Sequence, residues 1–434
     1  MSEATLPEHR LAVAYVVGNR LTPSETFIRR EIESLAANVE IVVASMDSGD
    51  VWRPSGGEVT GQAPWHSTAR ARQVSRWATA ASLGALWRVS QVERRGCLSA
   101  LRRALFADRV ARAISVPDLV HAHFASAPAS VARLLAHVLD RPWGVSVHAR
   151  DFYASRHRAV QVLAGASYAL ACSEVLADDL RRALRSAGAA TPVYTVHHGL
   201  DLRRWGFGPR LASVPPRIVA AGRFVPKKGF DTLIEALALL QRQRFAAELQ
   251  LLGDGPLRAA LQSRIDARGV ANHVQLGPWV QPGELQRALA NAAVFVMPSR
   301  ISEDGDRDNI ANVLIEAYAS GVPTVATSLP AIVRLVGDTQ ASVLVPPGDP
   351  IALANAIHRI CTDPELAESL RQRGRALATR SFDQSKTTAQ LYACFVRHAR
   401  GSHAAQRGRG PDQQLPSPPE RSARGQRVKS ASIE

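Results

Sequence analysis

The sequence predicts an α/β protein built from two doubly wound, Rossmann-like domains. Short apolar runs alternate with amphipathic stretches from residue 11 to residue 380, which is the pattern of buried parallel strands separated by helices. The chain has 434 residues, more than one hydrophobic core usually supports, so two domains of about 200 residues are expected. Glycines and prolines interrupt the pattern near residues 200 to 215, which indicates a boundary between the two halves.

The predicted strands form two sets of six. The first set covers residues 11–17, 39–45, 118–124, 143–149, 168–173 and 192–198, and the second covers residues 217–223, 247–253, 273–278, 293–299, 323–328 and 341–347. In doubly wound sheets, functional residues gather at the carboxyl ends of the strands. The site is therefore expected in the loops that follow these runs.

These patterns predict four regions of the chain. The first domain is expected at residues 1–205 and the second at residues 206–380, followed by a helix at residues 381–400 that returns to the first domain. Residues 401–434 lack aromatic side chains and hydrophobic periodicity, so this tail is predicted to be disordered.

The composition narrows the class of protein. The four cysteines form no CxxC pair, which argues against a zinc ribbon or a disulfide framework and fits a reducing cytoplasm. The apolar run near the start is only about eight residues long, a strand rather than a span. Acidic residues Glu3 and Glu8 precede it, where a signal peptide has basic ones. A net charge of +15 indicates attraction to polyanions such as nucleic acid, anionic lipid or phosphorylated substrates.

Positive charge is concentrated in residues 66–113. Ten arginines in this segment alternate with tryptophans and leucines at helical spacing, against only Glu93 and Asp108. Such a basic amphipathic surface predicts peripheral attachment to an anionic membrane on its cytoplasmic face. The alternative is an ordinary solvated helical face in an arginine-rich protein. Nucleic acid is not expected as a partner, because the segment has no recognition-helix, zinc or RNP pattern.

The most informative stretch is residues 297–328, which places Asp308 in a loop and Glu316 one turn inside the following helix. Asn309 or Asn312 is expected to cap that helix. Free backbone amides at its start attract phosphate, and a carboxylate one turn later can accept hydrogen bonds from ribose hydroxyls. The pattern predicts a nucleotide-sugar site, whereas the alternative is a polar surface loop before an ordinary capped helix.

A second stretch supplies the matching cations. Arg223 and Lys228 follow the predicted strand at residues 217–223, where a diphosphate opposite the helix start would lie. Residues 253–258, GDGPLR, begin like a dinucleotide fingerprint but place Arg258 at the third glycine position, and no Walker A sequence is present. A dehydrogenase or an ATPase is therefore disfavoured.

Ordered motifs in both halves carry a resemblance to a known family. AGRFVPKKGFDTLIEA, LLGDGPLR, VQLGPW, VFVMPS and EDGDRDNIANVLIEAYASGVPTVAT resemble the carboxyl-terminal half of the retaining GT-B glycosyltransferases of family four. SETFIRREIESL, HAHFA, SVHARDFY, CSEVLADDL and HHGLDLRRW resemble its branch that builds exopolysaccharides and other cell-surface glycans. The resemblance implies a GT-B fold, in which an acceptor-binding first domain and a nucleotide-sugar-binding second domain face one another across a cleft.

The resemblance also assigns roles to individual positions. The catalytic positions are His148 and Asp308; the donor diphosphate is bound by Arg223, Lys228, Asn309, Ile310, Ala311 and Asn312; ribose is bound by Glu316; and the acceptor side includes Ser24, Glu25, Thr26 and His123. Asp308 departs from the family, which has a glutamate there, and Ala311 replaces the usual proline.

The implied chemistry is a retaining hexosyl transfer from a UDP- or GDP-linked sugar to an acceptor hydroxyl. The acceptor would attack the face that the nucleotide leaves, and a departing phosphate oxygen would take its proton, so no dedicated protein base is needed. No cofactor and no metal are expected, although EDGD at residues 303–306 looks like a metal-binding motif. The expected acceptor is a saccharide or lipid-linked saccharide.

Other functions remain open at this stage. The same fold could serve a soluble small-molecule acceptor, catalyse epimerisation or hydrolysis of a nucleotide sugar, or be an inactive scaffold. A metal-dependent hydrolase could be assembled from the histidines at strand ends, but no HExxH motif or matching carboxylate accompanies them. These histidines are His121, His123, His148, His197 and His198.

Overall fold

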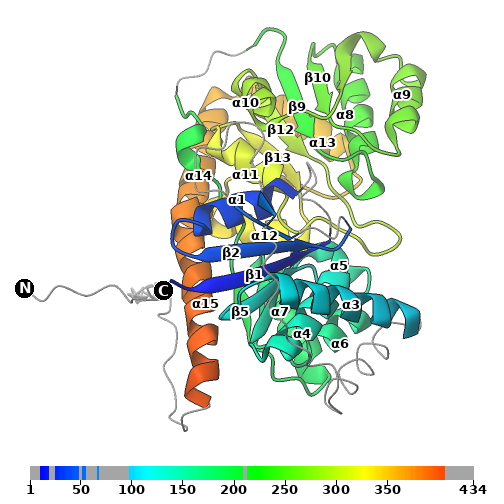
Figure 1. Ribbon diagram of the computed structural model, residues 1–434. Helices are drawn as coiled ribbons and strands as arrows, with labels where there is room; N and C mark the ends of the chain where they lie inside the picture. Colours follow the sequence, from blue (N-terminus) through cyan, green and yellow to red (C-terminus); the bar gives the residue numbers. More distant parts are fainter. Residues whose placement is uncertain are drawn as a thin grey trace, which may run out of the picture.

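The structure, a computed structural model, describes residues 10–18, 25–47, 51–54, 66–67, 97–208 and 213–405, which form two sheet-containing domains (Figure 1). The first domain contains an eight-stranded sheet of order β4-β3-β2-β1-β5-β6-β7-β8. Its strands are β1 Ala12–Val17, β2 Glu40–Ser45, β3 Val51–Arg53, β4 His66–Ser67, β5 Leu119–His123, β6 Trp143–Val147, β7 Tyr168–Ala171 and β8 Val193–Thr195. The pairing is parallel from β2 to β8.

The second domain contains a six-stranded parallel sheet of order β11-β10-β9-β12-β13-β14. Its strands are β9 Arg217–Ala221, β10 Glu248–Leu252, β11 Val274–Gly277, β12 Val294–Met297, β13 Thr324–Thr327 and β14 Val343–Val345. All twelve predicted apolar runs contain one of these strands, and the predicted fold class of two Rossmann-like domains is confirmed. The antiparallel edge strands β3 and β4 were not predicted.

Helices cover both faces of each sheet. The α-helices of the first domain are α1 Thr26–Leu35, α3 Cys97–Ala113, α4 Ala127–Leu139, α5 Ala149–Tyr153, α6 Arg156–Leu163 and α7 Glu174–Ser186. Those that follow are α8 Phe230–Arg242, α9 Arg258–Ala267, α10 Pro282–Ala290, α11 Asn312–Ala319, α12 Pro330–Val336, α13 Pro350–Thr362, α14 Pro364–Ser381 and α15 Gln384–Ala405. Short 3₁₀ turns lie at Leu202–Arg204, Pro226–Lys228, Ala271–His273 and Gly337–Thr339.

The core of each domain lies on the two faces of its sheet. In the first domain, α3, α4, α6 and α7 bury one face of the sheet. Helices α1 and α15 cover the other face, where Leu391, Cys394 and Phe395 of α15 pack with Tyr15 and Ile28. The last helix of the chain therefore contributes to the core of the first domain, and Figure 1 shows it running beside β1 and β2. It continues to Ala405, so residues 401–405 of the predicted tail are helical, and residues 406–434 lie outside the described residues.

The chain crosses between the domains at two places that lie side by side. The first crossing follows β8 and the second connects α14 with α15. The Leu200 amide donates to Phe382 O at 2.8 Å, and the Gln384 amide donates to Leu200 O at 3.1 Å. Gly199 permits this approach, because a Cβ atom there would lie 2.9 Å from the Cα atom of Gln384.

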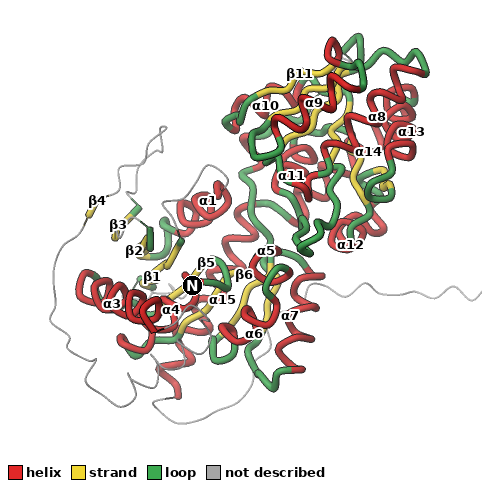
Figure 2. Tube along the Cα trace, turned by 90° about the vertical axis from the view of Figure 1, so that its right-hand side faces the viewer, coloured by secondary structure: helices red, strands yellow, loops and turns green. Residues whose placement is uncertain are grey.

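The two domains face each other through helices that follow strand ends. Helix α7 of the first domain lies against α12 of the second. Helix α1 lies next to α11 (Figure 2), and Arg30 of α1 forms an ion pair with Glu316 of α11. Among the described residues, no helix is long and apolar enough to cross a membrane.

Candidate functional site

A cleft of about 1670 Å³ lies between the two domains, at the carboxyl ends of strands from both sheets. Most of the predicted site residues line it: Glu25, Thr26, His148, Arg223, Lys228, Asp308, Asn309, Ile310, Ala311, Asn312 and Glu316. His123 is buried behind the cleft wall rather than lining it, and Ser24 lies outside the described residues.

Asp308 and Lys228 form a buried ion pair in the second domain. Lys228 Nζ lies 2.7 Å from Asp308 Oδ2, and Ser299 Oγ donates to the same oxygen at 2.6 Å. Lys227 Nζ lies 3.7 Å from Asp308 Oδ1. Burial alone would raise the pKa of Asp308, but the charges of Lys228 and Lys227 and the two hydrogen bonds bring it below its usual value. Asp308 is therefore an ionised carboxylate next to two lysines.

The backbone after Lys228 explains how this pair is positioned. Gly229 has φ +61°, in the left-handed region, and a Cβ atom there would lie 2.0 Å from Pro298 O. Only glycine lets the loop after β9 pack this closely on the loop after β12. Arg223, on the same loop, is exposed in the cleft, and its side chain makes no hydrogen bond or ion pair within the described part of the chain.

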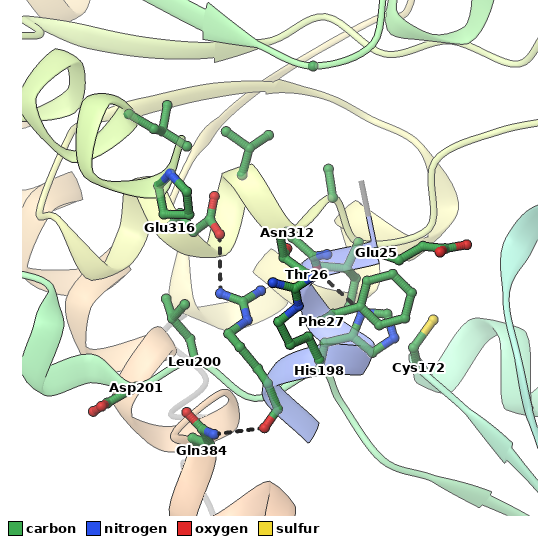
Figure 3. A pocket seen from close by; sticks show the side chains of 18 of the residues that line it. Glu25, Thr26, Phe27, Cys172, His198, Leu200, Asp201, Asn312, Glu316 and Gln384 are labelled. Atoms are coloured by element: carbon green, nitrogen blue, oxygen red, sulfur yellow. Dashed lines mark hydrogen bonds and ion pairs between the residues drawn. The ribbon is translucent and has the colours of Figure 1, made fainter. Parts of the chain in front are cut away.

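Helix α11 begins without a side-chain cap, which shows that the predicted Asn309 or Asn312 cap is wrong. The two asparagines contact the first domain instead. Ser173 Oγ donates to Asn309 Oδ1 at 2.5 Å, and His198 Nδ1 lies 3.1 Å from Asn312 Oδ1. Figure 3 shows Asn312 beside His198. The amides at the start of α11 therefore stay free of side-chain partners, as an anion site at a helix N-terminus requires.

The N-cap of α11 is Ala311, one of the two departures from the family pattern. Its φ of -70° is close to the value that proline would impose. The alanine thus keeps the backbone geometry of the usual proline.

Glu316 projects from α11 toward the first domain, where it meets Arg30 of α1. Arg30 Nη1 lies 3.3 Å from Glu316 Oε1, and Gln384 Nε2 donates to the carbonyl of Arg30 at 3.1 Å (Figure 3). Burial raises the pKa of Glu316, and the charge of Arg30 opposes this rise. The sequence analysis missed Arg30, because only the fold brings α1 over α11.

His148 stands at the end of β6 and begins α5. The Asp151 carboxylate fixes its backbone by accepting the His148 amide at 2.8 Å and, with its other oxygen, the Ala125 amide after β5. Burial raises the pKa of Asp151 to about 7. Burial, followed by the proximity of His198, lowers the pKa of His148 well below its usual value, so its ring is neutral at neutral pH.

Phe27 completes the first-domain wall of the cleft. Its ring stacks on that of His198 at a centroid distance of 4.1 Å and lies 5.1 Å from that of His148. Glu25 and Thr26 precede it at the start of α1, where Figure 3 shows all three side chains at the cleft. Phe27 was not among the residues predicted from sequence, because an aromatic residue on an amphipathic helix more often belongs to the core.

The histidines gather into two groups whose ligand atoms lie within 4.8 Å of one another and could hold a metal ion: His148, Cys172 and His198, and Glu31, His121 and His123. Protein partners already bind several of these nitrogens. His121 contacts Tyr168 Oη at 2.9 Å and Ser146 Oγ at 3.0 Å, and His123 Nε2 contacts Glu31 at 3.0 Å. Each contact satisfies a buried polar group without a metal.

The acidic EDGD loop does not converge on a common point. Asp306 pairs with Lys227 at 3.0 Å, and Asp304 accepts the Asp306 amide at 3.0 Å. Asp304 therefore stabilises its own loop, and Asp306 joins that loop to the loop after β9.

Comparisons with known proteins show which glycosyltransferases the chain resembles. Residues 215–363 match the family described as glycosyl transferases group 1. The chain is 32% identical over 197 residues to a putative colanic acid biosynthesis glycosyltransferase, WcaL, of Escherichia coli, covering 44% of this chain and 48% of that protein. It is 34% identical over 146 residues to the amylovoran biosynthesis glycosyltransferase AmsK of Erwinia amylovora, covering 34% and 36%. The chain thus spans about half or less of the length of these relatives.

Solved structures show the same fold over most of the chain. Sucrose-phosphate synthase of Thermosynechococcus elongatus superposes with a TM-score of 0.68 at 20% identity, covering 91% of this chain and all of that one. HepE of Anabaena, in complex with UDP-glucose, gives 0.63 at 16% identity, covering 89% and 100%. The GT-B fold is confirmed, and so is the predicted resemblance to group 1 glycosyltransferases of the exopolysaccharide branch.

Proposed function

We propose that this protein is a retaining glycosyltransferase that moves a sugar from a nucleoside-diphosphate sugar to an acceptor hydroxyl in the synthesis of a polysaccharide or other cell-surface glycan. The observation that carries this proposal is the convergence of four groups on one cleft. Arg223 and Lys228 lie at the end of β9, the uncapped start of α11 faces the same space, and Glu316 follows one turn later. His148 lies on the opposite wall. The cations and the helix start suit a diphosphate, Glu316 suits a ribose, and His148 suits the transferred sugar.

The second domain supplies the charge that the leaving group needs. As the bond to the anomeric carbon breaks, negative charge grows on the diphosphate, and Arg223, Lys228 and the positive end of α11 stabilise it. Asp308 keeps Lys228 in place at 2.7 Å before the donor arrives. This source of positive charge makes a metal ion unnecessary, so the proposed transfer is metal-independent and uses no cofactor.

The first domain positions the sugar and the acceptor. His148 is neutral and fixed by Asp151, so it acts by hydrogen bonding to the sugar and not as a nucleophile. The acceptor hydroxyl attacks the face that the diphosphate leaves and passes its proton to a phosphate oxygen. This route preserves the anomeric configuration and needs no protein base.

We propose a uridine or guanosine diphosphate sugar as donor. A UDP-glucose complex of HepE, which shares the fold, supports the nucleotide-sugar class. Among the relatives, a GDP-mannose-dependent phosphatidylinositol monomannoside mannosyltransferase of Mycolicibacterium smegmatis is 35% identical over 173 residues, with 44% of its length covered.

A lipid-linked acceptor is favoured by the outer surface of α3. Leu101 and Leu105, one turn apart, are 49% and 61% exposed, and Arg102 and Arg109 are exposed beside them. Exposed leucines among arginines suit the interface of an anionic bilayer on the cytoplasmic side. Residues 68–96 of the arginine-rich segment, which include Arg94 and Arg95, lie outside the described residues.

Sedimentation with vesicles tests the membrane part of the proposal. The protein should pellet with anionic but not neutral vesicles and be released by high salt, because exposed charges are screened within about 8 Å at physiological ionic strength. Arg102→Gln with Leu105→Ser should weaken the attachment, whereas Arg242→Gln in the second domain should not. Equal sedimentation with neutral vesicles would contradict an electrostatic attachment.

A donor screen tests the reaction itself. UDP- and GDP-sugars are compared by thermal shift, since a ligand that binds only the folded state raises the melting temperature by mass action. The stabilising donor, labelled in its sugar, is then incubated with lipid-diphosphate-linked saccharides and, separately, with soluble glycosides. Label in an α- or β-product of unchanged anomeric configuration is expected. Conversion of the donor without any acceptor would instead indicate an epimerase or a hydrolase.

A further inference from the structure

A chain of buried polar contacts leads from α1 to His148. Glu31 Oε1 lies 3.0 Å from His123 Nε2, and His123 Nδ1 lies 3.4 Å from His148 Nε2. The side chain of His123 is 1% exposed and that of Glu31 18%. Of these three residues, His148 lines the cleft, whereas Glu31 and His123 do not.

The first contact fixes the proton of His123. Burial alone would raise the pKa of Glu31, but the proximity and hydrogen bond of His123, the proximity of His121 and the hydrogen bond of the Tyr15 hydroxyl lower it to about 2. Glu31 is therefore ionised and can only accept hydrogen bonds. Consequently Nε2 of His123 must carry a proton and donate it to the carboxylate.

The second contact bears on which ring nitrogen of His148 carries the proton. With its Nε2 proton directed to Glu31, His123 presents the lone pair of Nδ1 to Nε2 of His148 at 3.4 Å, and a proton on that Nε2 can be donated to it. We propose that Glu31, acting through His123, is a positioning residue that keeps the proton of His148 on Nε2. Nδ1 of His148 is then the acceptor for a hydroxyl of the donor sugar.

This inference rests on the proposed function for its consequence but not for its geometry. A neutral histidine with the opposite tautomer would present an N–H group to the sugar hydroxyl instead of a lone pair. The sugar hydroxyl would then have to accept a hydrogen bond instead of donating one, which would turn it and shift the sugar relative to the acceptor. The nucleoside diphosphate, which binds on the second domain, would be unaffected.

The test compares Glu31→Gln with a matched control in the same buried cluster. Glutamine has the shape of glutamate but can donate through its amide, which permits the reversed proton order along both histidines. Tyr168→Phe is the control, because it removes a hydroxyl that binds His121 and lies outside the chain from Glu31 to His148. Glu31→Asp restores the charge on a shorter side chain.

The direct readout is the nitrogen NMR spectrum of ring-labelled histidines in the full chain. The wild type and Tyr168→Phe should show His148 protonated at Nε2, and Glu31→Gln should move proton population to Nδ1. With the best donor, kcat should fall about 10- to 100-fold in Glu31→Gln, by analogy with the loss seen when a carboxylate that orients a metal-binding histidine is removed. Glu31→Asp should recover part of this loss, and the affinity for UDP or GDP alone should change less than about threefold in each variant.

Several results would overturn the proposal. These are a wild-type His148 protonated at Nδ1, an unchanged tautomer and kcat in Glu31→Gln, or equal losses in Glu31→Gln and Tyr168→Phe. If the wild type uses no nucleotide sugar, the proposed function fails, and the tautomer measurement still decides the role of Glu31 by itself. If Glu31→Gln does not fold, the wild-type and Tyr168→Phe spectra together with Glu31→Asp kinetics decide it.

Discussion

Replacing Lys228 by methionine should separate the stability of the second domain from its affinity for a diphosphate. The change removes the charge but keeps an unbranched side chain only one atom shorter. Lys228 Nζ lies 2.7 Å from Asp308 Oδ2, with side-chain exposures of 13% and 9%. Breaking one half of such a buried pair costs about 3 to 5 kcal/mol. Lys227 and Ser299 still contact Asp308, so we expect the free energy of unfolding to fall by about 2 to 3 kcal/mol.

The effect on nucleotide binding follows from a different contact. A charge-assisted hydrogen bond to phosphate contributes about 1.5 to 3 kcal/mol. We therefore expect Lys228→Met to weaken binding of UDP or GDP by about 10- to 150-fold. Asp308→Asn should instead strengthen binding of UDP or GDP, because it removes a negative charge close to the phosphates while Lys228 remains.

The assays are urea unfolding and isothermal titration with the nucleoside diphosphate. In the double variant Lys228→Met, Asp308→Asn, the loss of stability should be smaller than the sum of the single losses by at least about 1 kcal/mol, because no buried charge is left without its partner. Unchanged affinity for the nucleoside diphosphate in Lys228→Met would refute the assignment of the diphosphate to the loop after β9. A stability loss that is strictly additive would refute the ion-pair argument.

Three further predictions concern the same cleft. Glu316→Gln should weaken nucleoside diphosphate binding by about 2 kcal/mol, measured by titration, because an amide replaces the acceptor of two ribose hydroxyls; equal affinity would remove Glu316 from the site. Transfer activity should persist in excess EDTA, and a loss restored by magnesium or manganese would show that the cleft uses a metal. The free energy of unfolding should fall by at least about 3 kcal/mol between pH 6.5 and pH 4, measured in urea, since burial also lowers the pKa of His148 and His398. Burial lowers the pKa of His121 to about 3 and of His198 to about 4, so their contribution is present above pH 6.5 and lost as pH falls through these values. Burial raises the pKa of Asp151 to about 7, so the buried Asp151 destabilises the fold less as pH falls. This gain offsets the loss from only one histidine. Stability that is flat or rises on acidification would contradict this balance.

The sequence predicted most of the fold, because strands and turns are marked by the residues of their own segments. Each of the twelve strands is a short apolar run bounded by turn residues, and the second domain's loops carry motifs of fixed spacing. β3 (VWR) and β4 (HS) lie in no apolar run and pair antiparallel at the sheet edge, so the alternation of apolar runs with helices does not mark them. The cation and carboxylate positions around Lys228 and Asp308 were predicted from sequence, whereas their direct ion pair was not.

Contacts between the domains were beyond the reach of sequence patterns. The predicted caps Asn309 and Asn312 follow sound local rules, but partners more than 100 residues away in the sequence compete for their side chains. Arg30 and Phe27 of α1 face the cleft for the same reason: their role depends on where α1 packs, and nothing in their own segment records it.

The paired crossings near Leu200 and Gln384 determine how the two domains can move. Two adjacent connections joined by backbone hydrogen bonds form a single hinge between the domains. They resist twisting and sliding of one domain on the other, while bending about their shared line remains soft. Opening about this hinge would therefore separate Arg30 from Glu316 and His198 from Asn312 in one rigid-body rotation. The reverse rotation would restore both contacts together.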